Sequence, residues 1–120
     1  MSDFVAFASG KSPHSLSAEE ILAWAGAIDN WAFYNTVALD IARGYYRGEL
    51  SYTFCDGLMN DLWFTVTVGL KNGEMVPYPF FEIFEAFDAG EFHRKADRSD
   101  DPVADFTDPA ISDIALRYNF

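Results

Sequence analysis

Residues 97–108 carry oxygen-bearing side chains at a spacing that could bind calcium. Oxygens stand at positions 1, 3, 5, 9 and 12 of a twelve-residue loop, as in an EF-hand, and these residues are Asp97, Ser99, Asp101, Asp105 and Asp108. Pro102 occupies the position that needs glycine for a sharp turn, and the last ligand is aspartate in place of the longer glutamate. The spacing therefore favours a solvated acidic loop over about residues 94–108, with calcium binding as the weaker alternative.

A second group of carboxylates lies on a helix that we expect over about residues 79–89. The apolar stripe of this helix faces the core, and Phe81 projects from the other side between acidic residues. An aromatic side chain surrounded by charges is typical of a protein-binding surface, because the ring anchors the partner and the charges select it. The residues expected to contact a partner are Phe81, Glu82, Glu85, Asp88 and Glu91.

The acidic side of this helix also has a simpler interpretation. Charged helix faces are commonly just solvated, and the N-terminal segment with Phe4, Val5 and Phe7 could cover Phe81. Against this, acidic residues three positions apart repel each other by a few tenths of a kcal/mol. Asp88 also lies in the last turn, where the helix dipole prefers cations. Acid placed at a cost to stability is an indication that it serves another purpose.

Other chemistry-bearing residues give no defined site. Cys55 lies on the expected core side of a helix, where a thiol behaves as a small apolar group. No phosphate-binding loop, nucleophile motif or metal-binding histidine pair occurs, so we expect no cofactor and no catalytic residues, and a non-enzyme is favoured over an enzyme. An aromatic-lined pocket between helices remains possible, formed by Trp24, Trp31, Trp63, Tyr45 and Tyr46.

Five helices are expected to position these residues. Ser17 and Glu20 form a capping box before a helix over about 18–29, and Gly48 terminates a second helix that starts at 31 or 36. Ser51 caps a third helix over about 52–63. The fourth helix ends near Gly90, and the last one begins at 108–109. The sequence predicts one all-α domain over residues 1–120, a small bundle of about five helices.

Residues 64–78 allow an alternative fold class. The run from 64 to 68 alternates β-branched residues, and Asn72-Gly73 is a strong hairpin turn signal. A short β-hairpin here would make the chain α+β.

The overall charge limits the partners. There are 19 Asp and Glu against 8 Lys and Arg, a net charge of −11, which disfavours nucleic acid and anionic membrane. Half of the residues are hydrophobic, enough for a real core in 120 residues. The single cysteine excludes an internal disulfide, and no signal-peptide or membrane-spanning pattern occurs, so we expect a cytoplasmic protein.

These patterns favour an acidic protein-binding module, an inhibitor or immunity-type protein that docks on a basic surface of a partner protein. The alternative is a small-molecule-binding protein or enzyme that uses an aromatic-lined pocket between helices. A third hypothesis is a self-associating structural protein, and the sequence leaves the oligomeric state open.

Overall fold

The computed structural model describes residues 3–10, 16–25, 30–69 and 75–120. Within these residues the chain forms six α-helices and no strand, which confirms the all-α prediction. The helices are α1 (Asp3–Ser9), α2 (Ala18–Ala25), α3 (Asn30–Tyr46), α4 (Tyr52–Gly69), α5 (Phe80–Asp88) and α6 (Asp108–Tyr118). A 3₁₀ turn, η1 (Ala89–Glu91), follows α5, and a π-helical turn, η2 (Val103–Thr107), precedes α6.

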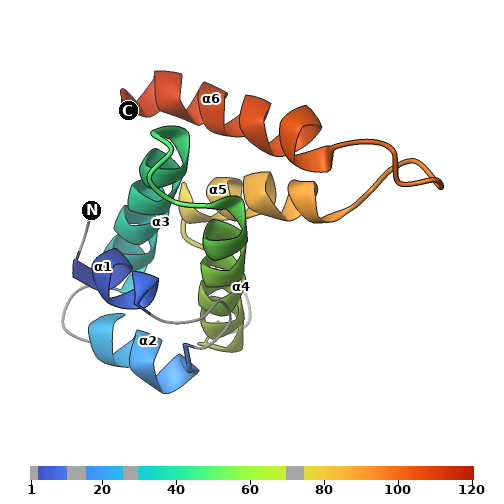
Figure 1. Cartoon of the computed structure of the whole chain (residues 1–120). Helices are drawn as coiled ribbons and strands as arrows, with labels where there is room; N and C mark the ends of the chain where they lie inside the picture. Colours follow the sequence, from blue (N-terminus) through green and yellow to red (C-terminus); the bar gives the residue numbers. More distant parts are fainter. Residues whose placement is uncertain (1–2, 11–15, 26–29, 70–74) are drawn as a thin grey trace.

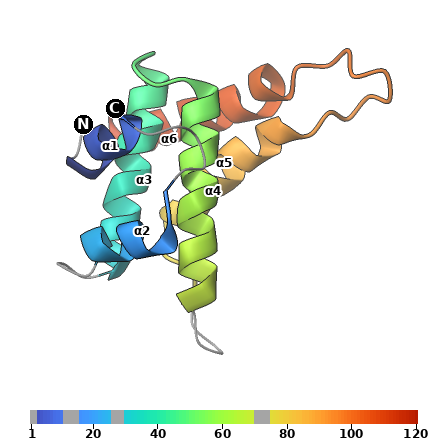
Figure 2. The ribbon, with the colours of Figure 1, turned by 60° about the horizontal axis from the view of Figure 1, so that its bottom comes forward.

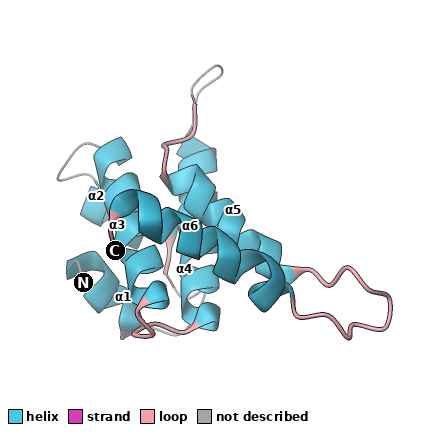
Figure 3. Ribbon diagram, turned by 90° about the horizontal axis from the view of Figure 1, so that it is seen from above, coloured by secondary structure: helices cyan, strands magenta, loops and turns pink. Residues whose placement is uncertain are grey.

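Helices α3 and α4 form an antiparallel pair, and α5 packs against both (Figure 1). Helix α6 crosses one end of this group and contacts α3 and α5, while α1 and α2 lie along its side (Figure 2). The segment between η1 and η2 projects away from the helices as a loop (Figure 3). None of the helices in the described ranges has the length and apolar character needed to cross a membrane.

The local signals read from the sequence act as expected. The Ser17 hydroxyl accepts a hydrogen bond from the Glu20 amide (3.2 Å), and the Glu20 carboxylate accepts one from the Ser17 amide (3.3 Å). Ser51 accepts a hydrogen bond from the Phe54 amide (3.1 Å) and begins α4. Gly48 follows α3 with a φ of 76°, a left-handed conformation that glycine adopts without strain. These contacts fix the starts of α2 and α4 and the end of α3.

The hairpin alternative is wrong for residues 64–69, because α4 continues through them. Thr65 and Thr67 satisfy their hydroxyls by donating to the carbonyl oxygens of Asp61 (3.1 Å) and Trp63 (2.9 Å). Helical continuation also buries Thr65 and Val66 in the core. Tertiary packing therefore overrides the β-propensity of the run. The Asn72-Gly73 signal lies outside the described residues.

The N-terminal helix α1 is the element that the sequence did not predict. Phe4 and Val5 are buried, and the Phe4 ring contacts Trp24 of α2 (5.8 Å between centroids) and Phe33 of α3 (5.2 Å). Seven residues are too few to show a helical period clearly. The segment therefore completes the core beside α2 and α3.

Two hydroxyl groups from distant parts of the chain hold the end of α5. Tyr52 donates to the Phe87 carbonyl (2.7 Å), and Thr107 donates to the Ala86 carbonyl (2.7 Å). Gly90 is buried between these hydroxyls, and a Cβ on it would lie 2.5 Å from the Thr107 oxygen and 2.8 Å from the Tyr52 oxygen. Helix α5 ends at Asp88 and is followed by the 3₁₀ turn η1. Glycine is needed at position 90 of this turn because a Cβ would clash with both oxygens.

The acidic loop predicted over 94–108 is more ordered than expected. The Asp100 carboxylate accepts a hydrogen bond from the Arg94 amide (2.7 Å) and lies 3.0 Å from the His93 ring nitrogen. The Arg94 guanidinium lies over the Phe106 ring, 3.8 Å from its centroid. Residues 103–107 are the π-helical turn, so the loop prediction is wrong for them. These contacts close the base of the projecting loop.

Candidate functional site

Phe81 is half-buried on α5, where the sequence placed an exposed anchor. Its ring lies against Trp63 of α4, with 5.8 Å between centroids, and Trp63 stacks on Phe84 at 4.3 Å with an interplanar angle of 9°. The cover expected from the N-terminal segment is thus supplied by α4. Phe81 presents part of its ring to solvent at the boundary between α4 and α5.

Glu82 differs from the other predicted partner-binding residues because it forms an ion pair within the chain. The Arg117 guanidinium on α6 pairs with both Glu82 and Asp113. The hydrogen bonds to these carboxylates raise the pKa of Arg117. Glu82 therefore joins α5 to α6, which gives it a structural role beside any role in binding.

The remaining predicted acids gather with one from another helix. Asp56 of α4 lies near Asp88 of α5 and Glu91 of η1, and Asp88 also interacts with Glu85; we call these four residues the acidic cluster. Asp56 and Glu91 interact through their carboxyl groups, and the Asn60 amide donates to Glu91 at 3.1 Å. The carboxylates thus form one group across two helices.

Burial and neighbouring negative charge both raise pKa values in the acidic cluster. Partial burial raises the pKa of Asp56 to about 8, and the hydrogen bond and negative charge of Glu91 add to this effect. The pKa of Asp88 is also raised, first by burial and then by the charges of Glu91 and Glu85. Both groups hold a proton more tightly than a free aspartate, first because burial disfavours the ionised form and second because neighbouring carboxylates repel it.

The acidic cluster receives no neutralising cation from the described part of the chain. The ion pairs there join Arg43 to Asp40, His93 to Asp100, and Arg117 to Glu82 and Asp113. Arg94 is close in sequence, but its guanidinium donates to the Ala89 carbonyl at 2.6 Å and to the Phe92 carbonyl. The guanidinium of Arg94 thus binds backbone carbonyl groups after α5 and not the carboxylates of the cluster.

The calcium candidates are not brought together. Asp97 accepts a hydrogen bond from the Ser99 amide (3.1 Å), Asp101 accepts one from the Ala104 amide (3.2 Å), and Asp108 accepts one from the Tyr45 hydroxyl (2.6 Å). Asp105 is exposed on η2. Within the described ranges, no three His, Cys, Asp or Glu side chains are placed to hold a metal ion. Residues that have EF-hand spacing in the sequence therefore belong to separate turns and helix ends in the structure.

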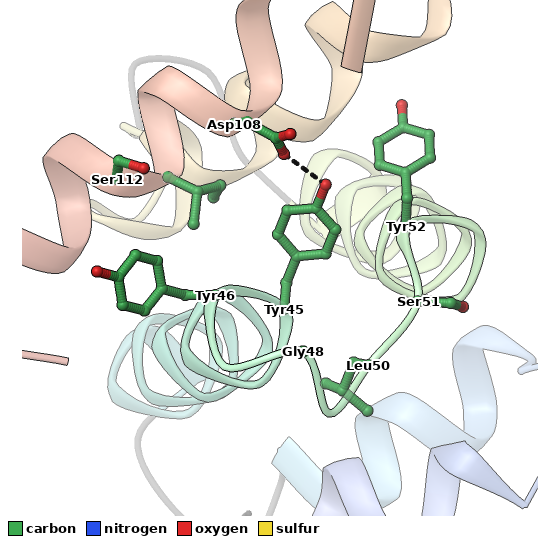
Figure 4. A pocket seen from close by; sticks show the side chains of 9 residues that line it. Tyr45, Tyr46, Gly48, Leu50, Ser51, Tyr52, Asp108 and Ser112 are labelled. Carbon is green, nitrogen blue, oxygen red and sulfur yellow. Dashed lines mark hydrogen bonds between the residues drawn. The ribbon is translucent and has the colours of Figure 1, made fainter. Parts of the chain in front are cut away.

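A pocket of about 530 Å³ lies between the end of α3, the start of α4 and the start of α6 (Figure 4). Tyr45 and Asp108 face each other across it through their hydrogen bond. Of the aromatic residues suggested by sequence, Tyr45 and Tyr46 line this pocket, whereas Trp24 packs on α1 and Trp63 on α5. The full lining comprises Tyr45, Tyr46, Gly48, Leu50, Ser51, Tyr52, Asp108, Ile111 and Ser112.

Two features of these sites had little signal in the sequence. Asp56 joins Glu91 across 35 positions, and Tyr45 meets Asp108 across 63. A helical wheel of α4 places Asp56 away from the core stripe but does not say which helix faces it.

Comparison of the chain with protein-family models, curated proteins and solved structures gives no match. The function of the chain is therefore inferred from its own geometry.

Proposed function

We propose that this chain is an acidic protein-binding module that docks on a basic surface of a partner protein, as an inhibitor or immunity-type protein does. The observation that carries the proposal is the acidic cluster, whose four carboxyl groups come from α4, α5 and η1 and form no ion pair with a cation of the described chain. Lys or Arg side chains of a partner would supply the missing positive charge.

The raised pKa values of Asp56 and Asp88 mean that ionising every carboxyl group of the acidic cluster is unfavourable. In the isolated fold Asp56 therefore keeps its proton near neutral pH, and an approaching cation would stabilise the ionised carboxylates in the complex. Binding therefore gains from relief of repulsion as well as from the new ion pairs. The net charge of −11 also attracts a basic partner over roughly 8 Å at physiological salt and accelerates association.

The apolar contribution comes from the edge of the acidic cluster. Phe81 and Trp63 are both half-buried and lie against each other, so a partner can cover their exposed edges without moving them. Side chains that are already fixed lose little conformational freedom on binding. The proposed contact residues remain Phe81, Glu85, Asp88 and Glu91. Glu82 contributes to the surface by holding α5 against α6 through its ion pair with Arg117.

The same charge argument makes nucleic acid and anionic membrane unfavourable as direct partners. Cytoplasmic location is part of this proposal and follows from the single cysteine, Cys55, which is buried. Burial raises the pKa of its thiol to about 12, so a nucleophilic role for Cys55 does not fit.

The test uses affinity capture from a lysate of the organism that makes the chain. The test variant carries Glu85→Gln, Asp88→Asn and Glu91→Gln, which remove three charges of the acidic cluster and keep side-chain size. The control variant carries Glu19→Gln, Glu49→Gln and Asp105→Asn, three exposed carboxylates elsewhere with the same charge change. The captured proteins are quantified by mass spectrometry at low and at high salt.

We expect one basic protein that wild type and control retain, that the test variant loses, and that high salt releases. Equal loss from both variants would mean that net charge alone attracts the protein and would refute the proposed surface. Retention by the test variant would refute it as well. Capture of the chain's own copies by wild type would favour self-association over a separate partner.

A further inference from the structure

The pocket between α3, α4 and α6 lies outside the proposed protein-binding surface and has its own chemistry (Figure 4). Its polar side chains are Asp108, Ser51, Ser112 and the tyrosines, and none of its nine lining residues is basic. Asp108 and Ser112 come from the first turns of α6, while the tyrosines come from α3 and α4. A ligand here would contact three helices that are distant in sequence.

Asp108 is oriented by Tyr45 and keeps one oxygen for another partner. The Tyr45 hydroxyl donates to Asp108 Oδ1 at 2.6 Å, and no hydrogen bond within the described chain reaches Oδ2. Burial and this hydrogen bond raise the pKa of Tyr45, so its hydroxyl stays protonated and acts as a donor. Asp108 is exposed, so its second oxygen can accept a hydrogen bond from a ligand.

Three tyrosines line the same pocket as this carboxylate, and one of them, Tyr45, contacts it directly. The rings of Tyr45 and Tyr52 lie 6.4 Å apart, and Tyr46 is half exposed at the edge of the pocket. Rings of this kind attract a cation at their faces through the negative charge of the π-system. Arg43 does not fill this role in the pocket, because its guanidinium bonds to Asp40 at 2.9 Å and lies over Phe120.

We infer that this pocket binds the ammonium group of an organic cation, with Asp108 as the counter-charge and the tyrosines as the surrounding walls. An ammonium group gives this carboxylate both a hydrogen bond and a counter-charge, whereas a neutral donor gives only the hydrogen bond and an anion is repelled. The volume of about 530 Å³ accommodates an ammonium group with a short alkyl or aromatic part. The inference does not depend on the proposed protein-binding function, because Asp108 is outside the acidic cluster.

The test is a titration followed by two-dimensional amide NMR. The probe is phenethylammonium, and 2-phenylethanol is the neutral control with the same ring and chain. We expect saturable shifts of amides around residues 45–52 and 108–112, with a Kd on the order of millimolar for so small a cation. The alcohol should give no saturable shifts at the same concentrations.

Variants locate the binding group. Asp108→Asn, which can still accept the Tyr45 hydrogen bond, should weaken phenethylammonium binding by about fivefold. Tyr46→Ala removes an exposed ring and should weaken it by about threefold without threatening the fold. Asp105→Asn, the same charge change three residues away and outside the pocket, should leave binding unchanged. An unchanged Kd in Asp108→Asn, or equal binding of the alcohol, would overturn the inference.

A second arm identifies the source of the ammonium group. The capped peptide acetyl-Ala-Lys-Ala-amide presents the same group on a protein chain. Tighter binding of the peptide would assign the pocket to a lysine of a partner, and tighter binding of the free amine would assign it to a small molecule. Either result supports an ammonium site, whereas no shift with either probe refutes it.

Discussion

Replacement of Gly90 by alanine tests how the end of α5 is held. Gly90 has an ordinary negative φ, so alanine would stabilise the fold by about 0.4–1 kcal/mol if there were space for its methyl group. The structure leaves no such space, because the new Cβ would lie 2.5 Å from the Thr107 oxygen and 2.8 Å from the Tyr52 oxygen. The two effects have opposite signs, which makes the outcome informative.

The magnitude follows from these contacts. Overpacking of a close-packed site costs about 1–3 kcal/mol. Both oxygens must also move away from the carbonyl groups of Ala86 and Phe87, and each weakened hydrogen bond adds about 1 kcal/mol. After subtracting the conformational gain, we expect Gly90→Ala to lower the free energy of unfolding by about 2–4 kcal/mol.

Urea unfolding monitored by circular dichroism measures this change. The matched control is Gly48→Ala, where no atom lies within 4 Å of the new Cβ and only the positive φ is unfavourable, at about 1 kcal/mol. In a background of Thr107→Ala and Tyr52→Phe, which removes both oxygens, Gly90→Ala should cost much less. A stabilising effect of Gly90→Ala in the wild-type background would refute the argument, and so would the same cost in both backgrounds.

Two further predictions concern the acidic cluster and a helix cap. Because the pKa of Asp56 rises from 3.8 to about 8 on folding, the folded state binds its proton more tightly, and thermal stability should fall as pH increases through this range. Asp56→Asn should flatten that dependence in melting curves between these pH values, and an unchanged slope would contradict the assignment. Ser51→Ala removes the cap of α4 and should lower the free energy of unfolding by about 1 kcal/mol in urea, whereas Ser112→Ala, which caps nothing, should change it little.

The sequence predicted the helices best where their signals are local. The capping box of Ser17 and Glu20 and the cap at Ser51 each involve residues three positions apart, so the spacing alone determines the contact. The run at 64–69 shows the opposite case, since its β-branched residues are helical because Thr65 and Val66 are buried by tertiary packing. Such packing depends on elements that no local window contains.

The candidate sites show the same division. The acids of α5 were found because they share one helix, but Asp56 was not assigned to them, because its meeting with Glu91 depends on how α4 lies beside α5. Of the aromatic residues suggested for a pocket, Tyr45 and Tyr46 line the one between α3, α4 and α6, whereas Trp63 stacks on Phe84. Asp108 was considered only as a calcium ligand, since nothing in the sequence relates it to Tyr45.

The closed base of the loop between η1 and η2 has a practical consequence for protein engineering. Arg94 and Asp100 fasten the two sides where the loop leaves the helices, and the amides of Arg98 and Ser99 bond within the tip, to Lys95 and Asp97. The tip can therefore be lengthened, labelled or opened to create new chain ends without disturbing the helices. An epitope or fluorophore inserted there would report on the protein from a position that projects away from its helical body (Figure 3).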